Sequence, residues 1–481
     1  VAVVGAGAAG LAAARELALE GLAPTVFEAG ESVGGVWAFT EETDSDAAGA
    51  DPARKRVHGS MYRNLRTNLP RELMSYAALP FGDAEGGGDT RRFVGHEAVE
   101  HYLEAYADRY GLREHVRLGT RVLEATPVDA AADGAPQVRL PAPDWRRPGA
   151  AVGLVPDTTA WRVTSSGAAG GDGGSERRVE VFDALCVCNG HYSEPRLPAL
   201  PGADAFPGEL VHSHNYRDTK GYEGKHVVVV GAGASGEDIA REVASVAECV
   251  HLSARSWKQL LPGFVPSPDD APIGAHKNVY RRGDVVALHA DGSVDFECGA
   301  RAPRADIVLM CTGYTYAFPF LEGANAVAVE DNRVGPLYEH MFTPALGASL
   351  SFIGLPWRVV PFPQFELQAK RIAAALSGRA PLPAGSEMAA HAAAEYARLD
   401  DAGVPQRHTH MLGAAQFEYN DRLADACAAP RLPQWREDMY KLTGQSKRAQ
   451  PELYRDEHMD EHLLPLVAQE VAQMQRVQAQ A

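Results

Sequence analysis

Two glycine-rich stretches of the sequence have the composition and spacing of dinucleotide-binding turns. They are VAVVGAGAAGLAAARELA at residues 1–18 and VVVVGAGASGEDIAREVA at residues 227–244. Each has a β-branched run, then Gly-x-Gly-x-x-Gly, then helix formers, which is the order of a strand, a tight turn and a helix. In such a unit the helix N-terminus faces the pyrophosphate of a nucleotide. The two copies therefore predict two bound dinucleotides.

The first turn has further features of a site for FAD. Glu28 ends the following strand, TVFEAG, 18 positions after Gly10, where its carboxylate can accept hydrogen bonds from both ribose hydroxyls. The next stretch, GESVGGVWAF, supplies a flexible turn and an aromatic ring suited to lie beside a flavin or an adenine. A purely structural glycine turn is the alternative. The residues predicted to bind FAD are Gly5, Ala6, Gly7, Gly10, Glu28, Gly35 and Trp37.

The second turn differs from the first at the position of the ribose-binding carboxylate. The strand after it reads CVHLSARSWK, with Ser253 at that position and Arg255 two residues later. Because an arginine can pair with a 2′-phosphate, the second site is predicted to prefer NADPH over NADH. The alternative is that Arg255 is a solvated surface charge. The residues predicted to bind NADPH are Gly231, Gly233, Gly236, Ser253 and Arg255.

An FAD unit followed by an NADPH unit describes a flavoprotein in which NADPH hands hydride to the flavin. The electrons are not expected to pass to a disulfide, because the cysteines form no Cys-x-x-Cys pair and are typical of reduced intracellular thiols.

No catalytic triad or carboxylate pair stands out. The segment HMDEH at 458–462 has an inverted zincin spacing without an apparent third ligand, so no metal site is predicted. The cysteines are Cys186, Cys188, Cys249, Cys298, Cys311 and Cys427.

Composition limits the partners. The 481-residue chain has a net charge of −17, which disfavours nucleic acid or an anionic membrane as the main partner. No uninterrupted apolar run reaches the roughly 18 residues of a membrane span. A cytoplasmic location is expected, although the chain opens inside the strand-like VAVV without a methionine, so a leader before Val1 is beyond what the sequence reveals. Oligomeric state is not determined by the sequence.

The strands and helices expected around these motifs indicate two doubly wound α/β units, each Rossmann-like. The FAD-binding domain is expected at residues 1–195 and 318–481, with the NADPH-binding domain, 196–317, inserted into it. The second part of the FAD-binding domain ends in a charged helical tail whose last helix is expected to pack on the surface. Gly/Ala/Asp-rich stretches are expected to be surface loops without a functional role. These stretches are 41–56, 82–90 and 165–178.

A motif at the junction of the two predicted units resembles a known family. The stretch FPGELVHSHNYR has Phe206, Gly208, His212 and Tyr216 in the spacing Phe-x-Gly-x-x-x-His-x-x-x-Tyr. This reproduces the identifying sequence of class B flavoprotein monooxygenases, and the chain is similar there to the flavin-containing monooxygenase family. The Baeyer–Villiger branch usually has tryptophan at the last position, so the tyrosine favours the branch that oxygenates nitrogen and sulfur.

The resemblance extends over most of residues 1 to about 378. The segment LRTNLPRELMSYAALPF at 65–81 resembles the family's Thr-Asn segment, with Thr67 and Asn68, and DIVLMCTGYTYAFPFL at 306–321 resembles its Thr-Gly-Tyr linker, Thr312 to Tyr314. The segment 331–356 is closest to plant S-oxygenating members that act on glucosinolate thioethers. The segment 356–371 departs from those members, so the substrate is not identified.

The resemblance implies roles for individual residues. Asn68 matches an asparagine near the flavin ring and the nicotinamide that protects the oxygenated flavin. Val36 and Trp37 match residues lining the flavin, and Ser235 matches the NADP pyrophosphate loop, as does Gly236. The motif around His212 matches a linker that couples the two domains, so its role is conformational and not that of an acid or base. The linker residues are Phe206, Gly208, His212, Tyr216, Thr312, Gly313 and Tyr314.

The predicted activity is NADPH- and O₂-dependent oxygenation of a small soft nucleophile, a thioether sulfur or an amine nitrogen. In this chemistry reduced flavin and O₂ give a C4a-hydroperoxide, which a dry pocket protects from collapse to H₂O₂. Two kinds of alternative stay open. One is a ketone-oxidising Baeyer–Villiger or an auxin-forming decarboxylating monooxygenase, and the other is an uncoupled NADPH oxidase or redox sensor.

Overall fold

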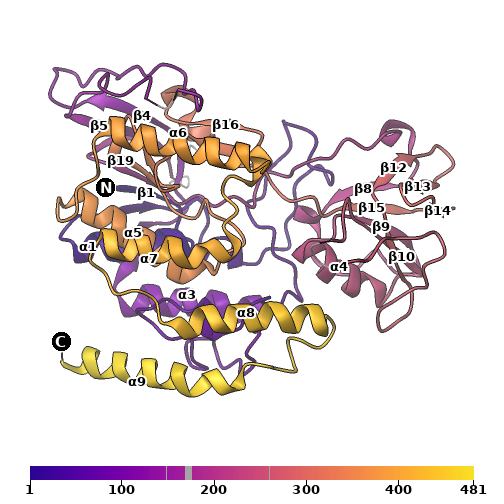
Figure 1. Ribbon diagram of the computed structural model, residues 1–481. Helices are drawn as coiled ribbons and strands as arrows, with labels where there is room; N and C mark the ends of the chain where they lie inside the picture. Colours follow the sequence, from indigo (N-terminus) through magenta and orange to yellow (C-terminus); the bar gives the residue numbers. More distant parts are fainter. Residues whose placement is uncertain (148, 168–175, 259–260, 481) are drawn as a thin grey trace.

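Two sheet-bearing bodies make up the computed structural model, which describes residues 1–147, 149–167, 176–258 and 261–480. In Figure 1 the larger body holds the N-terminus and most of the helices, and the smaller body holds β8 to β15 and α4. The helices are α1 Ala8–Leu19, α2 Arg71–Met74, α3 His96–Arg109, α4 Ala234–Ala244, α5 Pro361–Leu376, α6 Gly385–Asp401, α7 Gln416–Ala426, α8 Gln434–Ala449 and α9 Leu464–Gln480.

The larger body is built on a six-stranded sheet with the order β18-β19-β7-β1-β2-β3, parallel except for β18. The chain winds from β1 to β2 and β3 on one side, and β7 and β19 lie on the other side. The reversal beside β1 is the point at which such sheets bind ligands, at the carboxyl ends of the strands. The strands are β1 Ala2–Val4, β2 Thr25–Phe27, β3 Val116–Arg117, β7 Leu185–Val187, β18 Phe342–Thr343 and β19 Gly347–Phe352.

Both faces of this sheet are covered, which explains why its strands are apolar throughout. Val3 of β1 packs with α1, α3 and α5, whereas its neighbours Ala2 and Val4 pack on the opposite face, on the side of the antiparallel sheet β4-β5-β6. Successive side chains of a strand point to opposite faces, so a continuous apolar run fills both cores. The strands of the antiparallel sheet are β4 Arg121–Asp129, β5 Thr159–Ser166 and β6 Arg177–Phe182.

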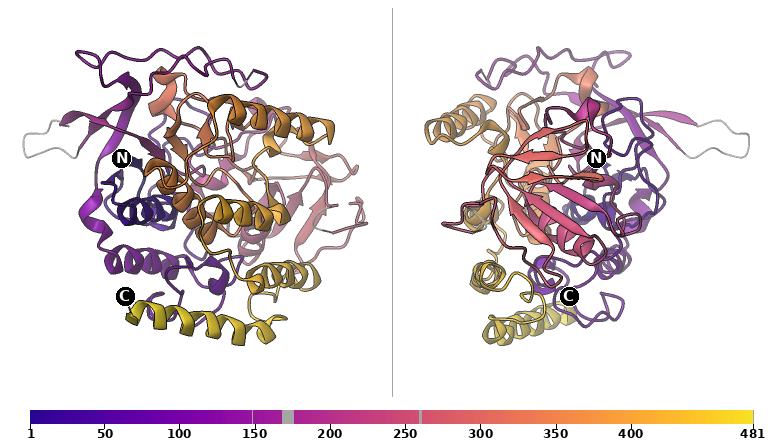
Figure 2. Two further views of the ribbon diagram at one scale, coloured as in Figure 1. Left: turned by 60° about the vertical axis from the view of Figure 1, so that its left-hand side comes forward. Right: turned by 90° about the vertical axis from the view of Figure 1, so that its right-hand side faces the viewer.

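The smaller body repeats the arrangement in a five-stranded parallel sheet, β11-β10-β9-β15-β8 (Figure 2). Here β9 occupies the position that β1 has in the first sheet, and α4 follows it. The predicted fold class, two Rossmann-type α/β units, is confirmed. The strands of this body are β8 Glu209–His212, β9 His226–Val230, β10 Cys249–Ser253, β11 Val279–Arg282, β12 Val285–Leu288, β13 Val294–Phe296, β14 Arg301–Ala302 and β15 Ile307–Met310.

The C-terminal part of the chain returns to the larger body. A short hairpin, β16 Ala328–Glu330 and β17 Arg333–Gly335, precedes β18, and helices α5 to α9 follow. The last helix, α9, packs through Leu464 and Val467 on the cluster around Trp435 of α8, together with Leu463 just before the helix. Within the described ranges, no helix combines the length and the apolar character needed to cross a membrane.

Candidate functional site

Close packing fixes the glycines of the first turn, which joins β1 to α1 as predicted. A side chain at Gly10 would place its Cβ 1.8 Å from the carbonyl oxygen of Gly5, and Gly5 has a φ of +102°. The N-cap of α1 is Gly7, which cannot cap the helix with a side chain, and no other side-chain cap is present among the described residues. The amides of the first turn of α1 can therefore receive an anion.

Glu28 follows β2, and its carboxylate lies beside the first turn. One carboxylate oxygen accepts a hydrogen bond from the amide of Ala6 at 2.7 Å, and the other accepts one from the amide of Gly30 at 2.7 Å. Each oxygen has a second lone pair, so each can also accept a ribose hydroxyl. The structure thus holds the carboxylate where a ribose-binding acid is expected, and the contact with the ribose stays a prediction.

Residues 34–37 form a sharp turn against the first glycine turn. Its two glycines have φ values of +123° and +60°, which glycine adopts most readily. Val36 and Trp37 lie in the single 3₁₀ turn that follows, and the half-buried ring of Trp37 packs edge-on against Phe362 of α5 with 6.5 Å between ring centroids. The two residues therefore lie beside the predicted FAD turn, and their contact with a flavin stays a prediction.

The second turn has the same backbone as the first. Gly231 has a φ of +106°, and a Cβ on Gly236 would lie 1.8 Å from the carbonyl oxygen of Gly231. In contrast, a Cβ on Gly233 would meet no heavy atom within 4 Å among the described residues. Gly233 and Ser235 are exposed at the start of α4. Packing accounts for two of the three glycines, and the third faces open space at a helix N-terminus.

Ser253 and Arg255 are placed differently. Ser253 is fully buried, and its hydroxyl donates to the carbonyl of Gly283 at 2.8 Å, so it ties the end of β10 to the turn before β12. Arg255 is exposed and lines a cavity of about 450 Å³ between the two bodies. In the structure the Ser253 hydroxyl makes a structural hydrogen bond to Gly283. A role of Ser253 in nucleotide binding stays a prediction.

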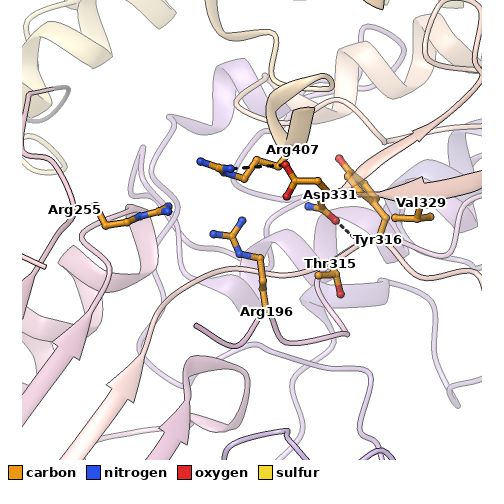
Figure 3. A pocket seen from close by; sticks show the side chains of 8 residues that line it. Arg196, Arg255, Thr315, Tyr316, Val329, Asp331 and Arg407 are labelled. Atoms are coloured by element: carbon orange, nitrogen blue, oxygen red, sulfur yellow. Dashed lines mark hydrogen bonds and ion pairs between the residues drawn. The ribbon is translucent and has the colours of Figure 1, made fainter. Parts of the chain in front are cut away.

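Three arginines from three separate segments meet at this cavity (Figure 3). Arg196, Arg255 and Arg407 point toward one another, and Arg407 lies 3.8 Å from the carboxylate of Asp331. Burial lowers the pKa of Arg196, and the positive charges of Arg255 and Arg407 lower it further. One carboxylate facing three guanidinium groups leaves a net positive cavity that suits a phosphate. The sequence pointed to Arg255 alone, because the other two are far away along the chain.

Thr67 and Asn68 lie on a loop of the larger body. The Thr67 amide donates to the carbonyl of Val94 at 2.9 Å, which fixes the loop. The Thr67 hydroxyl is buried and has no hydrogen-bond partner among the described residues, whereas the Asn68 side chain is exposed. An unpaired buried hydroxyl next to an exposed amide is the arrangement expected where a polar ligand completes the site.

Phe206, His212 and Tyr216 of the motif are buried, and Gly208 is half-buried. A Cβ on Gly208 would lie 2.7 Å from the carbonyl oxygen of Asp306, so the strand requires glycine there. Tyr216 is buried and packs edge-on against Tyr62 with 5.6 Å between centroids. Phe206 packs in the core between β9 and β12 to β15. These residues act as packing contacts in the structure, and their role in domain coupling stays a prediction.

His212 ends β8 and is fully buried. Burial lowers its pKa to about 4, so its ring is neutral at pH 7. Its Nδ1 accepts a hydrogen bond from the amide of His214 at 3.1 Å, and its ring lies 5.4 Å from that of Tyr314. The ring is therefore packed in place in its neutral form, and its role in coupling the two domains stays a prediction.

Arg217, directly after the motif, is a residue that sequence reasoning missed. Its buried guanidinium donates five hydrogen bonds to backbone carbonyls at two separate parts of the chain. The acceptors are Thr40, Glu42 and Gly59 on one side and His214 and Tyr216 on the other. The arginine therefore ties the motif to the segment 40–59 of the larger body.

Residues 41–56 form a loop that is mostly exposed, as expected, but two of its charged side chains are buried. Asp44 and Arg54 form a buried ion pair at 2.6 Å, with side chains 0% and 1% exposed. The amide of Asp44 donates to the side chain of Asn215, within the motif, at 2.9 Å. The polar composition of the stretch suggested that all its charges face solvent. Instead the two charges neutralise each other and the segment is hydrogen-bonded to the motif, so the cost of burying the charges is offset. Part of the stretch 165–178 lies outside the described residues.

The two connections between the bodies run side by side. Arg196 donates its amide to the carbonyl of Gly313 at 2.9 Å, and Thr315 donates its amide to the carbonyl of Glu194 at 2.9 Å. Thr312, after β15, donates its hydroxyl to the carbonyl of Arg196 at 2.5 Å. The Thr312–Tyr314 segment thus pairs with the first crossing, as two strands of one hinge would.

Two glycine turns at helix N-termini, a carboxylate beside the first and an arginine-lined cavity after β10, the strand that follows the second, fit two dinucleotides. The Thr67 hydroxyl, on a loop of the larger body, is buried and unpaired among the described residues. This combination defines a two-dinucleotide flavin oxidoreductase with Rossmann-type units.

Comparison with known proteins defines the family. The profile of the flavin-binding monooxygenase-like family matches residues 1–139, 157–263 and 274–435. The protein called flavin-containing monooxygenase FMO GS-OX-like 4 of Arabidopsis thaliana is 42% identical over 96% of this chain and 95% of its own length. The chain belongs to the flavin-containing monooxygenase family, as the resemblance implied, and is an FAD- and NADPH-dependent monooxygenase.

Solved structures agree with this assignment. S-allyl-L-cysteine S-oxygenase from Allium sativum superimposes with a TM-score of 0.86 at 41% identity, covering 98% of each chain. Tmm from Pelagibacter sp. strain HTCC7211 has a TM-score of 0.72 at 22% identity, covering 95% of this chain and 92% of its own, which supports the fold alone.

Proposed function

We propose that the protein inserts one atom of O₂ into the sulfur of a small thioether, with amine nitrogen as a second class of acceptor. The observation that carries the proposal is the similarity over almost the whole chain to the S-allyl-L-cysteine S-oxygenase of Allium sativum. Tyr216 at the last position of the motif supports the same branch. A bound flavin, once reduced by NADPH, supplies the activated oxygen.

The residues of the chain would bind, orient and exclude water. Glu28 and the first glycine turn would hold FAD, with Val36 and Trp37 beside it. The Asn68 amide would face the flavin and the nicotinamide, and the Thr67 hydroxyl would gain a partner there. Proton leakage and water entry shorten the life of an activated oxygen, so a closed site matters more than an acid or base. We place the domain boundaries at the paired crossings, near residues 195 and 317.

The first test is stopped-flow absorbance of NADPH-reduced holoenzyme mixed with oxygenated buffer without substrate. We expect a spectrum distinct from oxidised and reduced flavin that persists for many seconds and decays faster when S-allyl cysteine is added, with one sulfoxide formed per NADPH. A direct return to oxidised flavin with stoichiometric H₂O₂ would contradict oxygenation and indicate an oxidase. Product from a ketone or a 2-oxo acid, and none from a thioether, would identify the other branches.

We propose further that the arginine-lined cavity binds the 2′-phosphate of NADPH. Replacing Arg255 by alanine should lower kcat/KM for NADPH by about 10- to 100-fold, because a charge-assisted hydrogen bond contributes about 1.5–3 kcal/mol. Replacing Arg407 by alanine should lower it in the same direction. Neither change should alter kcat/KM for NADH, which lacks the phosphate.

Steady-state kinetics with both nucleotides measure this difference. Arg304, which pairs with Asp306 at 2.8 Å in the same body, provides a control variant, Arg304→Ala, that should leave both values unchanged. Equal losses for NADPH and NADH in Arg255→Ala would show that the arginine does not recognise the phosphate.

A further inference from the structure

The segment after α8 joins the two bodies at a point away from the paired crossings. Residues 447–456, here called the C-terminal clasp, begin in the last turn of α8 and contact both α4 and the loop that carries Thr67. Figure 1 shows α8 running along the base of the larger body with its C-terminal end toward α4. The contacts of the clasp are polar and are concentrated on Arg455.

Arg455 binds both bodies with one guanidinium group. Its Nε donates to the carbonyl of Thr67 at 2.9 Å, and its Nη2 donates to the carbonyl of Arg66 at 3.2 Å. Both Nη atoms also contact the carboxylate of Asp238 on α4, with the Nη1 bond at 3.1 Å. The side chains of Arg455 and Asp238 are only 14% and 17% exposed. A bidentate pair shielded from water is held more firmly than a surface ion pair.

Three further ion pairs surround Arg455. Two reach α4: Lys447 lies 3.0 Å from Glu237, and Glu452 lies 3.2 Å from Arg241. The third, between Asp456 and Arg66 at 2.8 Å, holds the clasp to the Thr67 loop. The neighbour Tyr454 is 2% exposed and packs edge-on against Phe93, 5.5 Å between centroids, which anchors the clasp in the larger body.

The two elements that Arg455 joins are the two halves of the proposed site. Asp238 is the fifth residue of α4, the helix whose N-terminus follows Gly233 and faces the predicted NADPH pyrophosphate. Thr67 directly precedes Asn68, the predicted contact of flavin and nicotinamide. Residues just before Thr67 also contact α4 directly, because Asn64 donates to Glu242 at 2.6 Å and Tyr62 packs in the α4 core. The separation between nucleotide and flavin therefore depends in part on contacts made by the C-terminal segment, although that segment contributes no nucleotide-binding motif.

We propose that Arg455 is a positioning residue that keeps the NADPH-binding helix and the Asn68 loop in register, so that oxygen is transferred to substrate and not released as H₂O₂. This inference rests on the proposed function. Two bodies joined by a hinge can separate unless further contacts hold them. Loss of the clasp would leave α4 and the loop joined only through residues 62–65, and the looser contact at Thr67 and Asn68 would admit water to the reacting atoms.

The test uses the full-length holoenzyme with Arg455→Ala, Arg455→Lys and the control Arg448→Ala. Arg448 is an exposed arginine at the end of α8 and makes no ion pair within the described part of the chain. We expect Arg455→Ala to raise the ratio of H₂O₂ released to NADPH consumed by about threefold to tenfold, since small displacements in a site cost large factors in rate. Arg455→Lys should fall between it and the wild type, because lysine keeps the charge but not the fork.

Hydrogen exchange provides a readout that does not depend on activity. In Arg455→Ala the amides of residues 62–68 and 234–244 should exchange faster, while those of the sheet strands keep their protection. Flavin content should match that of Arg448→Ala, whereas the melting temperature should be somewhat lower, because two carbonyls and the Asp238 carboxylate lose a partner.

Each outcome decides the proposal. Unchanged H₂O₂ release together with unchanged exchange in Arg455→Ala would overturn it. Faster exchange throughout the protein, with flavin loss, would also overturn it, in favour of a general role in stability. If wild-type enzyme forms no oxygenated product, the proposed function fails, but local faster exchange in the two segments would still establish the clasp.

Discussion

Replacing Arg217 by alanine should destabilise the junction between the two bodies. The loss of stability should exceed that of any substitution described above. Five backbone carbonyls from two distant segments would lose their donor. An unsatisfied buried polar group costs about 1–3 kcal/mol, so a loss of about 4 kcal/mol or more is expected even where water replaces some of the bonds. The thermal midpoint, measured by differential scanning fluorimetry, should fall by about 5 °C or more.

Two variants make this result interpretable. Arg217→Lys keeps the positive charge but offers donors from a single nitrogen, so its midpoint should lie between those of Arg217→Ala and the wild type. Arg63 lies on a neighbouring loop, is half exposed and pairs with Glu41 at the surface, so Arg63→Ala should leave the midpoint unchanged. A midpoint of Arg217→Ala equal to that of Arg63→Ala would show that the five hydrogen bonds do not hold the junction.

Replacing Gly233 by alanine should weaken the use of NADPH and leave the fold and the flavin site intact. The added Cβ meets no heavy atom within 4 Å among the described residues, and the backbone of Gly233 is extended, with φ −74° and ψ −170°, so alanine is not strained there. If the pyrophosphate lies against this turn, the Cβ occupies its space at a cost of about 1–3 kcal/mol. The value of kcat/KM for NADPH should then fall by about 5- to 150-fold, with flavin content and melting temperature unchanged.

Gly236→Ala separates a nucleotide effect from a folding effect. Its Cβ would lie 1.8 Å from a backbone oxygen, so α4 must move, and both stability and NADPH use should fall. Isothermal titration with NADP⁺ alongside thermal melting measures both. Unchanged NADP⁺ affinity in Gly233→Ala would mean that the nucleotide does not approach this turn.

Local spacing explains why the core of the site could be predicted. The glycines, Glu28, and Ser253 in place of a carboxylate all lie in local units in which a strand, a turn and a helix follow one another in the chain. Such units fold the same way wherever they occur, because backbone sterics and helix termini fix their geometry. The apolar strands that precede the two glycine turns were predicted for the same reason.

The charged residues could not be predicted in the same way. Asp44 and Arg54 lie in a stretch whose composition is that of an exposed loop, and Arg217 bonds Thr40 across 177 positions of sequence. A charged side chain is buried only where a partner compensates its charge. No local sequence pattern shows whether a distant residue will be that partner.

The sequence by itself therefore determined the two Rossmann-type units, their order, the cofactors and the family, because glycine spacing and strand hydrophobicity act over a few residues. Only the tertiary structure decided that Arg196 and Arg407 join Arg255 at one cavity, and that Arg455 reaches α4 and the Thr67 loop together. Those contacts depend on how two bodies and a C-terminal segment pack, and packing brings together side chains that lie hundreds of positions apart.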